Sequence, residues 1–237
     1  MINDLLINVL LLTTITFVVG NILKDIPSKI IAGLYGNVIA GVVGGLLGIL
    51  LMTYTFQVKG NTTLLDLRVF AIMLVSSIGG ILPTIVSGII IGIFRLLYFG
   101  LNMPSIVAVF HILLYIICFH IIEKWMKSEW KKWFLKTLIS LIILITFYCY
   151  LLRNLENVQT VILQFSFIAI STSILEYFLL YYAKYSNEIY RMYKKDATKD
   201  FLTGLYNTRQ FNTRESDVIG RIGGEEFCVL LSNCPSD

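Results

Sequence analysis

The segment GNTTLLDLRVFAIMLVSSIGGILPTIVSGIIIGIFRLLYFG, residues 60–100, decides the fold class of this protein. It contains an apolar block, residues 69–99, that is 31 residues long. About 20 apolar residues in a helix suffice to cross the hydrocarbon core of a bilayer, so this block is too long for one straight crossing. Gly79, Gly80 and Pro83 stand near its middle and predict a kinked or interrupted membrane helix.

The composition of the whole chain agrees with a membrane protein. Hydrophobic residues make up 57% of the 237 residues, charged residues make up 14%, and the mean hydropathy is +0.78. An average globular domain carries about 25% charged residues. Six apolar blocks are each long enough to cross a bilayer: 5–22, 30–54, 69–99, 104–122, 134–152 and 158–183. We therefore predict a mainly α-helical, polytopic membrane bundle of about six spans.

The connection EKWMKSEWKKWFLK, residues 123–136, predicts the orientation of the bundle. It holds five lysines, two glutamates and three tryptophans, Trp125, Trp130 and Trp133. Lysine-rich loops stay in the cytoplasm, and tryptophans gather in the belt at the membrane interface. A lipid-binding or peptide-binding amphipathic helix is the alternative interpretation.

Counting one crossing for each block from this loop places both the C-terminal tail and the N-terminus in the cytoplasm. Lys24 and Lys29 then fall on the outer side, which counts against this arrangement. A different number of crossings through residues 69–99 would reverse the sides of the first three loops. The formal net charge of +4 comes largely from lysines that flank the apolar blocks. No basic stripe lies on a soluble fold, so we expect no nucleic-acid partner.

Glycines within the second and third blocks indicate close helix packing. Three pairs have the small-xxx-small spacing that lets helix backbones approach: Gly41 and Gly45, Gly44 and Gly48, and Gly88 and Gly92. Packing inside one bundle is the simplest interpretation. A dimer seam or the wall of a pocket is the alternative.

Charged residues interrupt the apolar pattern at Asp66, Arg68 and Arg95. Ionisable groups at membrane depth are costly and are usually paired or functional. If the long third block folds back, Arg68 and Arg95 approach one cavity beside Asp66, which predicts a sensor pocket for a small acidic ligand. Alternatively, all three side chains reach the membrane interfaces and have no ligand. Glu176, isolated in the last block, is predicted to be a hydrogen-bond partner within the bundle.

These features resemble the 5TMR-LYT sensor module of LytS-type histidine kinases over roughly residues 1–183. The matching features are Asp66-x-Arg68, Gly79-Gly80-x-x-Pro83, and Arg95 followed by Gly100. The resemblance implies a membrane receptor that precedes a cytoplasmic signalling output, with a ligand that the family leaves largely undefined.

A polar segment, KYSNEIYRMYKKDATK, residues 184–199, follows the last block. Tyr185, Ile189 and Met192 recur at helical spacing, so we predict a helical linker that continues the last membrane helix. Such a linker is a possible seam for a homodimer, although fewer than three heptads are present and a coiled coil is not established.

The tail, residues 200–237, contains two motifs in order. DFLTGLYN, residues 200–207, resembles the opening signature of GGDEF-type diguanylate cyclases, and GGEEF, residues 223–227, resembles their defining motif. A diglycine in a hairpin lets the backbone approach a nucleotide, and carboxylates beside it can hold divalent cations. The resemblance implies a domain that condenses two GTP molecules into cyclic di-GMP with Mg²⁺.

The same resemblance assigns roles to single residues of the tail. Gly223 and Gly224 would bind the substrate phosphates, and Glu225 would be the metal ligand. Glu225 and Glu226 would be the catalytic carboxylates, here vestigial. Arg214 and Asp217, in TRESDVIG, would form the cyclic di-GMP inhibition site.

The tail departs from the family because it is short. Fifteen residues separate Asn207 from Gly223, where the family has a longer insert with a second metal-binding strand. The chain ends ten residues after Phe227, and 38 residues are too few for a stable core without staples. We therefore expect a partial GGDEF domain, internally deleted and truncated, that has lost catalysis. The alternatives are a cyclic di-GMP-binding tail, and a small-ligand receptor or transport-related subunit with a non-functional tail.

Overall fold

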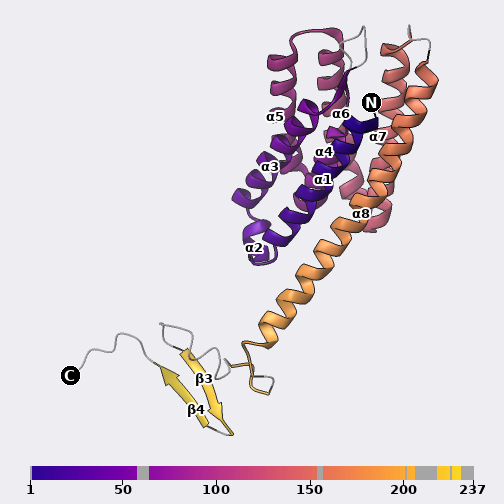
Figure 1. The fold of residues 1–237 in the computed structure, drawn as a ribbon. Helices are drawn as coiled ribbons and strands as arrows, with labels where there is room; N and C mark the ends of the chain where they lie inside the picture. Colours follow the sequence, from indigo (N-terminus) through magenta and orange to yellow (C-terminus); the bar gives the residue numbers. More distant parts are fainter. Residues whose placement is uncertain are drawn as a thin grey trace. The chain divides into compact units, whose positions relative to one another are not determined.

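The computed structural model describes residues 2–57, 64–153, 157–200, 202–205, 218–224 and 226–230. The chain divides into two compact units, Met1–Ala183 and Lys184–Asp237. The first unit is a bundle of helices, drawn from indigo to light orange in Figure 1.

Among its described residues, the first unit contains eight helices in chain order with one short two-stranded ribbon. Its elements are α1 (Ile2–Ile22), α2 (Ser28–Ile31), α3 (Leu34–Thr53), β1 (Phe56–Gln57), β2 (Leu64–Leu65), α4 (Arg68–Gly79), α5 (Ile81–Phe99), α6 (Met103–Trp125), α7 (Glu129–Leu151) and the first part of α8 (Val158–Asp196). Among the described residues, six helices are long and apolar enough to cross a membrane: α1, α3, α5, α6, α7 and α8. This confirms the predicted mainly helical fold with about six spans.

The apolar block 69–99 is interrupted, as its glycines predicted. Gly80 separates α4 from α5 and has φ 72° and ψ −137°, a conformation that residues with a Cβ rarely adopt. α4 has 12 residues and is therefore about 18 Å long, well short of a bilayer core. All of its residues from Val69 to Ser76 are buried, so α4 is the inner helix of the bundle.

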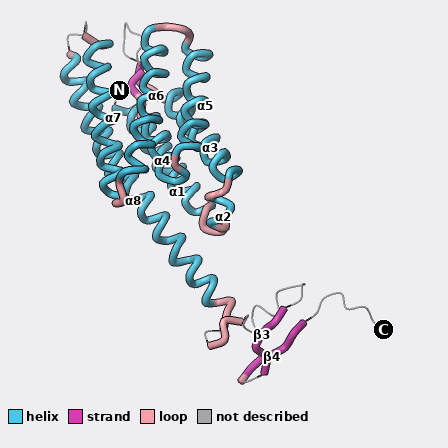
Figure 2. Tube along the Cα trace, turned by 180° about the vertical axis from the view of Figure 1, so that it is seen from behind, coloured by secondary structure: helices cyan, strands magenta, loops and turns pink. Residues whose placement is uncertain are grey.

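Contacts at both ends of α4 define its direction. At its start, the Arg68 Nη1 atom donates to the Met52 sulfur at 3.0 Å, near the end of α3. At its end, Gly79 lies so close to Asn37, near the start of α3, that an added Cβ would stand 2.2 Å from the Asn37 Oδ1 atom. α4 therefore runs antiparallel to α3, and α5 returns along it, as the tube in Figure 2 shows.

This hairpin corrects the predicted count of one crossing for each block. Because α4 and α5 run in opposite directions, the third block begins and ends at the same end of the bundle. The start of α1 also lies at this end, where the Asn8 Nδ2 atom donates to the Tyr54 carbonyl oxygen after α3. We call this the pocket end. The start of α1 and the 123–136 connection therefore lie at opposite ends of the bundle, which agrees with the alternative number of crossings through residues 69–99.

The opposite end of the bundle holds the connections that carry Lys24, Lys29, Lys127 and Lys131, and we call it the lysine end. There the Lys136 Nζ atom near the start of α7 donates to the Ser77 hydroxyl at the end of α4. α1 runs away from the pocket end, so the segment with Lys24 and Lys29 lies at the lysine end as well. The lysines that opposed the sequence-based count thus gather on one side, as membrane topology favours.

Glycines bring α3 and α5 into close contact within the chain. A Cβ at Gly41 would stand 2.6 Å from the Val86 Cβ atom, and a Cβ at Gly45 would stand 2.8 Å from the Ile90 Cβ atom. These distances leave no room for a side chain on α3. The interpretation of these glycines as packing residues inside one bundle is confirmed.

We expect Gly41→Ala to lower the free energy of unfolding by about 1–3 kcal/mol, because the added methyl group overpacks this contact. Gly92→Ala is the matched control, since the nearest atom to its added Cβ lies 3.9 Å away. Thermal unfolding of both variants in the same detergent provides the measurement. Equal midpoints for the two variants would contradict the packing described here.

The second unit contains the end of α8, a turn at residues 202–205 and a hairpin of β3 (Val218–Gly223) and β4 (Glu226–Leu230). The strands pair antiparallel, with Val218 opposite Leu230 and Gly223 opposite Glu226. Gly224 lies in the connecting turn with φ 50°. The predicted hairpin is present, and in the described part of this unit the sheet has two strands.

Candidate functional site at the pocket end

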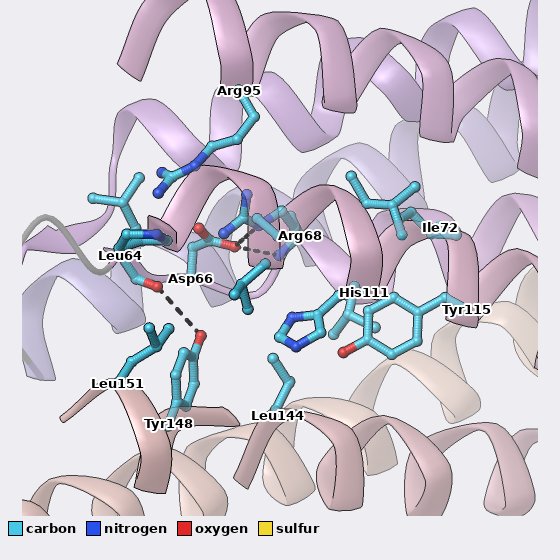
Figure 3. Close-up of a pocket in the computed structure, with 15 residues that line it drawn as sticks. Leu64, Asp66, Arg68, Ile72, Arg95, His111, Tyr115, Leu144, Tyr148 and Leu151 are labelled. Atoms are coloured by element: carbon cyan, nitrogen blue, oxygen red, sulfur yellow. Dashed lines mark hydrogen bonds and ion pairs between the residues drawn. The ribbon is translucent and has the colours of Figure 1, made fainter. Parts of the chain in front are cut away.

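A small cavity opens at the pocket end between α4, α5, α6 and α7 (Figure 3). Its polar lining consists of Asp66, Arg68, Arg95, His111, Tyr115 and Tyr148. The cavity volume is about 30 Å³, which is room for about two water molecules. The structure therefore brings the three predicted pocket residues, Asp66, Arg68 and Arg95, to one cavity.

Asp66 and Arg68 are held in place by the start of α4. The Asp66 Oδ1 atom accepts hydrogen bonds from the Arg68 backbone N–H at 3.1 Å and from the Arg68 Nε atom at 2.8 Å. The first bond satisfies a backbone donor that a helix start leaves free. The Asn8 Oδ1 atom accepts from the Leu67 N–H at 3.2 Å and anchors the same turn to α1. The Oδ1 atom of Asp66 is thus fully engaged by Arg68. The Asp66 side chain is 1% exposed.

Arg95 brings a second cation to the cavity from α5. Its residue is 1% exposed, and its guanidinium lies 4.7 Å from the centre of the Phe99 ring. The Nε and Nη1 atoms of Arg95 and the Oδ2 atom of Asp66 have no hydrogen-bond partner among the described residues. Buried polar atoms without partners are costly and uncommon in native proteins. Arg95 can therefore still donate hydrogen bonds to a molecule bound in the cavity, and Asp66 can still accept one from it.

α6 and α7 complete the wall with groups that the sequence did not single out. The His111 Nε2 atom and the Tyr115 hydroxyl also lack partners within the described ranges. Tyr148 of α7 donates its hydroxyl to the Leu64 carbonyl oxygen at 3.3 Å. His111 and Tyr115 are four residues apart and hence lie on one face of a helix. This spacing was the feature of the sequence from which their common place in the wall could have been predicted.

Comparison with known proteins now identifies this bundle. The family described as 5TMR of 5TMR-LYT matches residues 20–179. The chain belongs to the 5TMR-LYT family. Its membrane unit is accordingly a sensor domain with several spans.

A curated relative of this 5TMR-LYT protein is the uncharacterized protein YhcK of Bacillus subtilis (strain 168). The two are 26% identical over 295 aligned positions, which cover all of this chain and 80% of the relative. The alignment is 58 positions longer than the 237-residue chain, so at least that many positions of YhcK have no counterpart here. No solved structure matches the chain.

The lysine end of the 5TMR-LYT bundle contains a buried ion cluster. Lys136 is 0% exposed, and its Nζ atom contacts the Glu123 Oε1 atom at 2.6 Å and the Ser77 hydroxyl at 2.8 Å. The second Glu123 oxygen contacts the Lys132 Nζ atom at 2.9 Å. These bonds tie the end of α4 to α6 and α7.

α7 is in turn joined to α8. The Trp133 Nε1 atom donates to the Ser173 carbonyl and hydroxyl oxygens, both at 3.0 Å, and the Thr137 and Ser173 hydroxyls are 2.6 Å apart. Trp133 is 5% exposed, so its predicted place in the interfacial tryptophan belt is wrong. Trp125 and Trp130 are exposed, as that belt requires.

Glu176 lies further along α8 and is fully buried. Its Oε2 atom accepts a hydrogen bond from the Thr16 hydroxyl at 2.8 Å, which joins α8 to α1. The prediction that Glu176 is a hydrogen-bond partner within the bundle is confirmed.

The tail brings its two motifs together through an arginine that the sequence did not single out. The Arg221 Nη1 atom contacts both Asp200 carboxylate oxygens, at 3.1 and 3.0 Å, and the Nε atom donates to the Gly224 carbonyl at 2.6 Å. Asp200 also accepts from the Thr203 N–H and hydroxyl. The DFLTG turn is thus bonded to the hairpin of the GGEEF segment.

The predicted nucleotide and metal residues of the tail are described only in part. Gly223 and Gly224 lie at the hairpin turn, and Glu226 is exposed at the start of β4. Arg214, Asp217 and Glu225 lie outside the described residues. Within the described ranges, no group of three or more His, Cys, Asp or Glu side chains could hold a metal ion. The Mg²⁺ site that the resemblance implied includes Glu225 and therefore stays a prediction.

The Asp200 contact gives a pH prediction. Hydrogen bonds from Thr203, followed by the Arg221 guanidinium, lower the pKa of Asp200 below its ordinary value. A lowered pKa stabilises the folded form above the unfolded pKa of about 3.9, and this stabilisation is lost as the pH falls through the folded value. We expect the turn–hairpin contact to persist at neutral pH and to break only at a pH below the unfolded pKa of Asp200. Carboxyl ¹³C NMR of Asp200 checks this, and an unchanged titration in Arg221→Gln would contradict it.

Proposed function

We propose that this protein is a membrane receptor that binds a small anionic ligand in the cavity of the pocket end. In this proposal α8 carries the response to a tail derived from a GGDEF-type diguanylate cyclase, and the tail no longer makes cyclic di-GMP. The family membership supports the receptor part, and the two tail motifs support the link to cyclic di-GMP signalling.

Buried Arg95 is the observation that carries the receptor proposal. A cation that is 1% exposed and has unpartnered Nε and Nη1 atoms among the described residues needs an anion or water to satisfy it. Arg68 adds positive charge beside the cavity, although Asp66 neutralises part of it. Arginine offers a planar fork that matches a carboxylate, so a small carboxylate is the ligand that fits best.

The proposed orientation follows from the lysines. The connections that carry Lys24, Lys29, Lys127 and Lys131 lie at the lysine end, so this end is assigned to the cytoplasm. The cavity then faces the outer side, where it can sample ligands outside the cell. α8 also reaches the lysine end, because Ala183 of α8 lies beside Gly20 at the end of α1. We accordingly propose a cytoplasmic tail.

A path of hydrogen bonds joins the cavity to α8 within the membrane unit. Asp66 and Arg68 form the start of α4, and Ser77 at its end is bonded to Lys136 of α7. Trp133 of α7 is bonded to Ser173 of α8. A ligand that shifts the start of α4 therefore acts on a buried helix whose far end is bonded to α7, and through α7 to α8. The exposed Tyr185 and Met192 on α8 are the proposed seam for a homodimer.

Loss of cyclase activity is proposed for the tail because the motifs remain while the intervening segment is short. The alignment leaves at least 58 positions of YhcK without a counterpart, which is enough to include such a deleted segment. Gly223, Gly224 and Glu225 would then be remnants of the phosphate and metal site, and Arg214 and Asp217 remnants of the inhibition site. We expect purified protein with GTP and Mg²⁺ to release no cyclic di-GMP detectable by chromatography with mass detection. Steady turnover would contradict this part of the proposal.

The receptor proposal is tested on the full chain in detergent. Acetate, glycolate and glycine are each titrated at constant ionic strength while the thermal unfolding midpoint is recorded, with Arg95→Met as the variant that removes the cation. At least one of the three compounds is expected to raise the midpoint of the wild type and to have no effect on the variant. If none of them raises the midpoint, a small-carboxylate receptor is excluded.

A further inference from the structure

We infer that the cavity selects ligands in which a carboxylate stands next to a hydrogen-bond donor, either a hydroxyl or an amine. This inference rests on the proposed receptor function and adds the chemical class of the ligand. It comes from the opposite charges of two unsatisfied groups at the cavity, Asp66 and Arg95.

The cavity contains a free acceptor as well as free donors. The Oδ1 atom of Asp66 is occupied by Arg68, whereas its Oδ2 atom is buried and unpartnered among the described residues. The Nε and Nη1 atoms of Arg95 are likewise buried and unpartnered among the described residues, and both side chains line one cavity. Figure 3 shows Asp66 and the end of Arg95 directed toward the same space. A ligand that satisfies both must accept hydrogen bonds at one point and donate at another.

A carboxylate without a donor satisfies only half of this site. Its oxygens can bind Arg95, but they then bring negative charge close to the bare Asp66 Oδ2 atom in a region of low dielectric constant. A hydroxyl or amine on the neighbouring carbon replaces this repulsion with a hydrogen bond. Sites built around buried polar groups discriminate strongly against analogues that leave those groups unpaired.

The other polar groups of the wall suit the carboxylate part of such a ligand. The Tyr115 hydroxyl and, in one tautomer, the His111 Nε2 atom are donors without partners in the described part of the chain. They come from α6, whereas Arg95 comes from α5. The cavity wall thus offers free donors from two helices, α5 and α6, beside the free acceptor of Asp66.

The size of the cavity limits the ligand to the smallest members of this class. About 30 Å³ holds about two water molecules, so even a two-carbon acid requires side chains of the wall to shift. Glycolate and glycine are the two-carbon compounds that carry both groups. Acetate has the same carboxylate and carbon skeleton without the donor, which makes it the matched control.

The experiment compares the dissociation constants of acetate, glycolate and glycine for the full chain, obtained from the thermal titrations. We expect glycolate, glycine or both to bind at least tenfold more tightly than acetate, and the two arms separate a hydroxyl ligand from an amine ligand. In Asp66→Asn, which removes the negative charge, this preference should fall below threefold. The wild-type comparison alone tests the inference if that variant does not fold.

The outcomes separate the two claims. Equal binding of acetate and of the donor-bearing acids overturns this inference and leaves the receptor proposal intact. Absence of binding for all three overturns the receptor proposal, and the inference with it. A preference that survives fully in Asp66→Asn overturns the assignment of the donor contact to Asp66.

Discussion

Glu123→Gln is expected to lower the free energy of unfolding of the membrane unit by about 3–5 kcal/mol. Lys136 is 0% exposed, and among the described residues its charged partner is Glu123, at 2.6 Å. The Ser77 hydroxyl also bonds to Lys136 but carries no charge. A glutamine at position 123 would leave a buried ammonium group without a counterion, which is the most expensive way to break a buried pair.

Glu129→Gln is the matched control because Glu129 pairs with Lys132 at 2.8 Å while its side chain is 55% exposed. An exposed pair of this kind contributes at most about 1 kcal/mol. Lys136→Met placed in the Glu123→Gln background should restore most of the lost stability, since it removes the uncompensated charge. Chemical unfolding in mixed micelles, followed by tryptophan fluorescence, provides the free energies. If both single variants lose the same stability, the Lys136 pair is not the structural element described here.

Arg95→Met is expected to raise the free energy of unfolding by about 1–3 kcal/mol, the cost of an unsatisfied buried polar group, and to abolish stabilisation by small carboxylates. Arg95 is buried with unpartnered Nε and Nη1 atoms among the described residues, so the ligand-free protein carries the desolvation cost of a cation without full compensation. Methionine has a flexible apolar side chain that can fill the same space beside Phe99. Stability and ligand binding are thus expected to change in opposite directions at this residue.

Arg153→Met is the control for this second prediction. Arg153 is exposed after the end of α7, with its guanidinium 5.3 Å from the centre of the Tyr150 ring. Its replacement should leave both the unfolding midpoint and the ligand response within error of the wild type. Thermal unfolding with and without glycolate provides both readouts. A loss of stability in Arg95→Met would mean that the guanidinium is satisfied inside the bundle, which contradicts an anion-binding role.

The sequence predicted the membrane spans well because length and hydropathy act locally. It also predicted the break near Gly79 and Gly80, and the meeting of Arg68 with Arg95 if the third block folds back. It left open whether the break kinks the helix or reverses the chain. A glycine permits a positive φ but does not say whether the next helix continues or returns, since that depends on packing against α3. The count of one crossing for each block put Lys24 and Lys29 on the outer side, and this conflict with the positive-inside rule was the sign that the count was wrong.

Contacts between residues far apart in the chain could not be predicted from the sequence, for a different reason. Lys136 was grouped with a cytoplasmic loop, yet its position two turns into α7 turns it inward to Glu123 and Ser77. Arg221 and Asp200 are 21 residues apart and belong to different motifs, so no local spacing indicates their contact. Tyr115 and Tyr148 reach the cavity from two helices whose relative rotation is set by packing.

The brevity of α4 also constrains how the nascent chain enters the bilayer. A 12-residue helix that begins with arginine cannot remain across the hydrocarbon core alone while the ribosome continues synthesis. We expect it to be retained beside the insertion machinery until α5 emerges, so that the two helices enter together as a hairpin. Residues 68–99 would then be one unit of membrane integration, although they form two helices of the sensor.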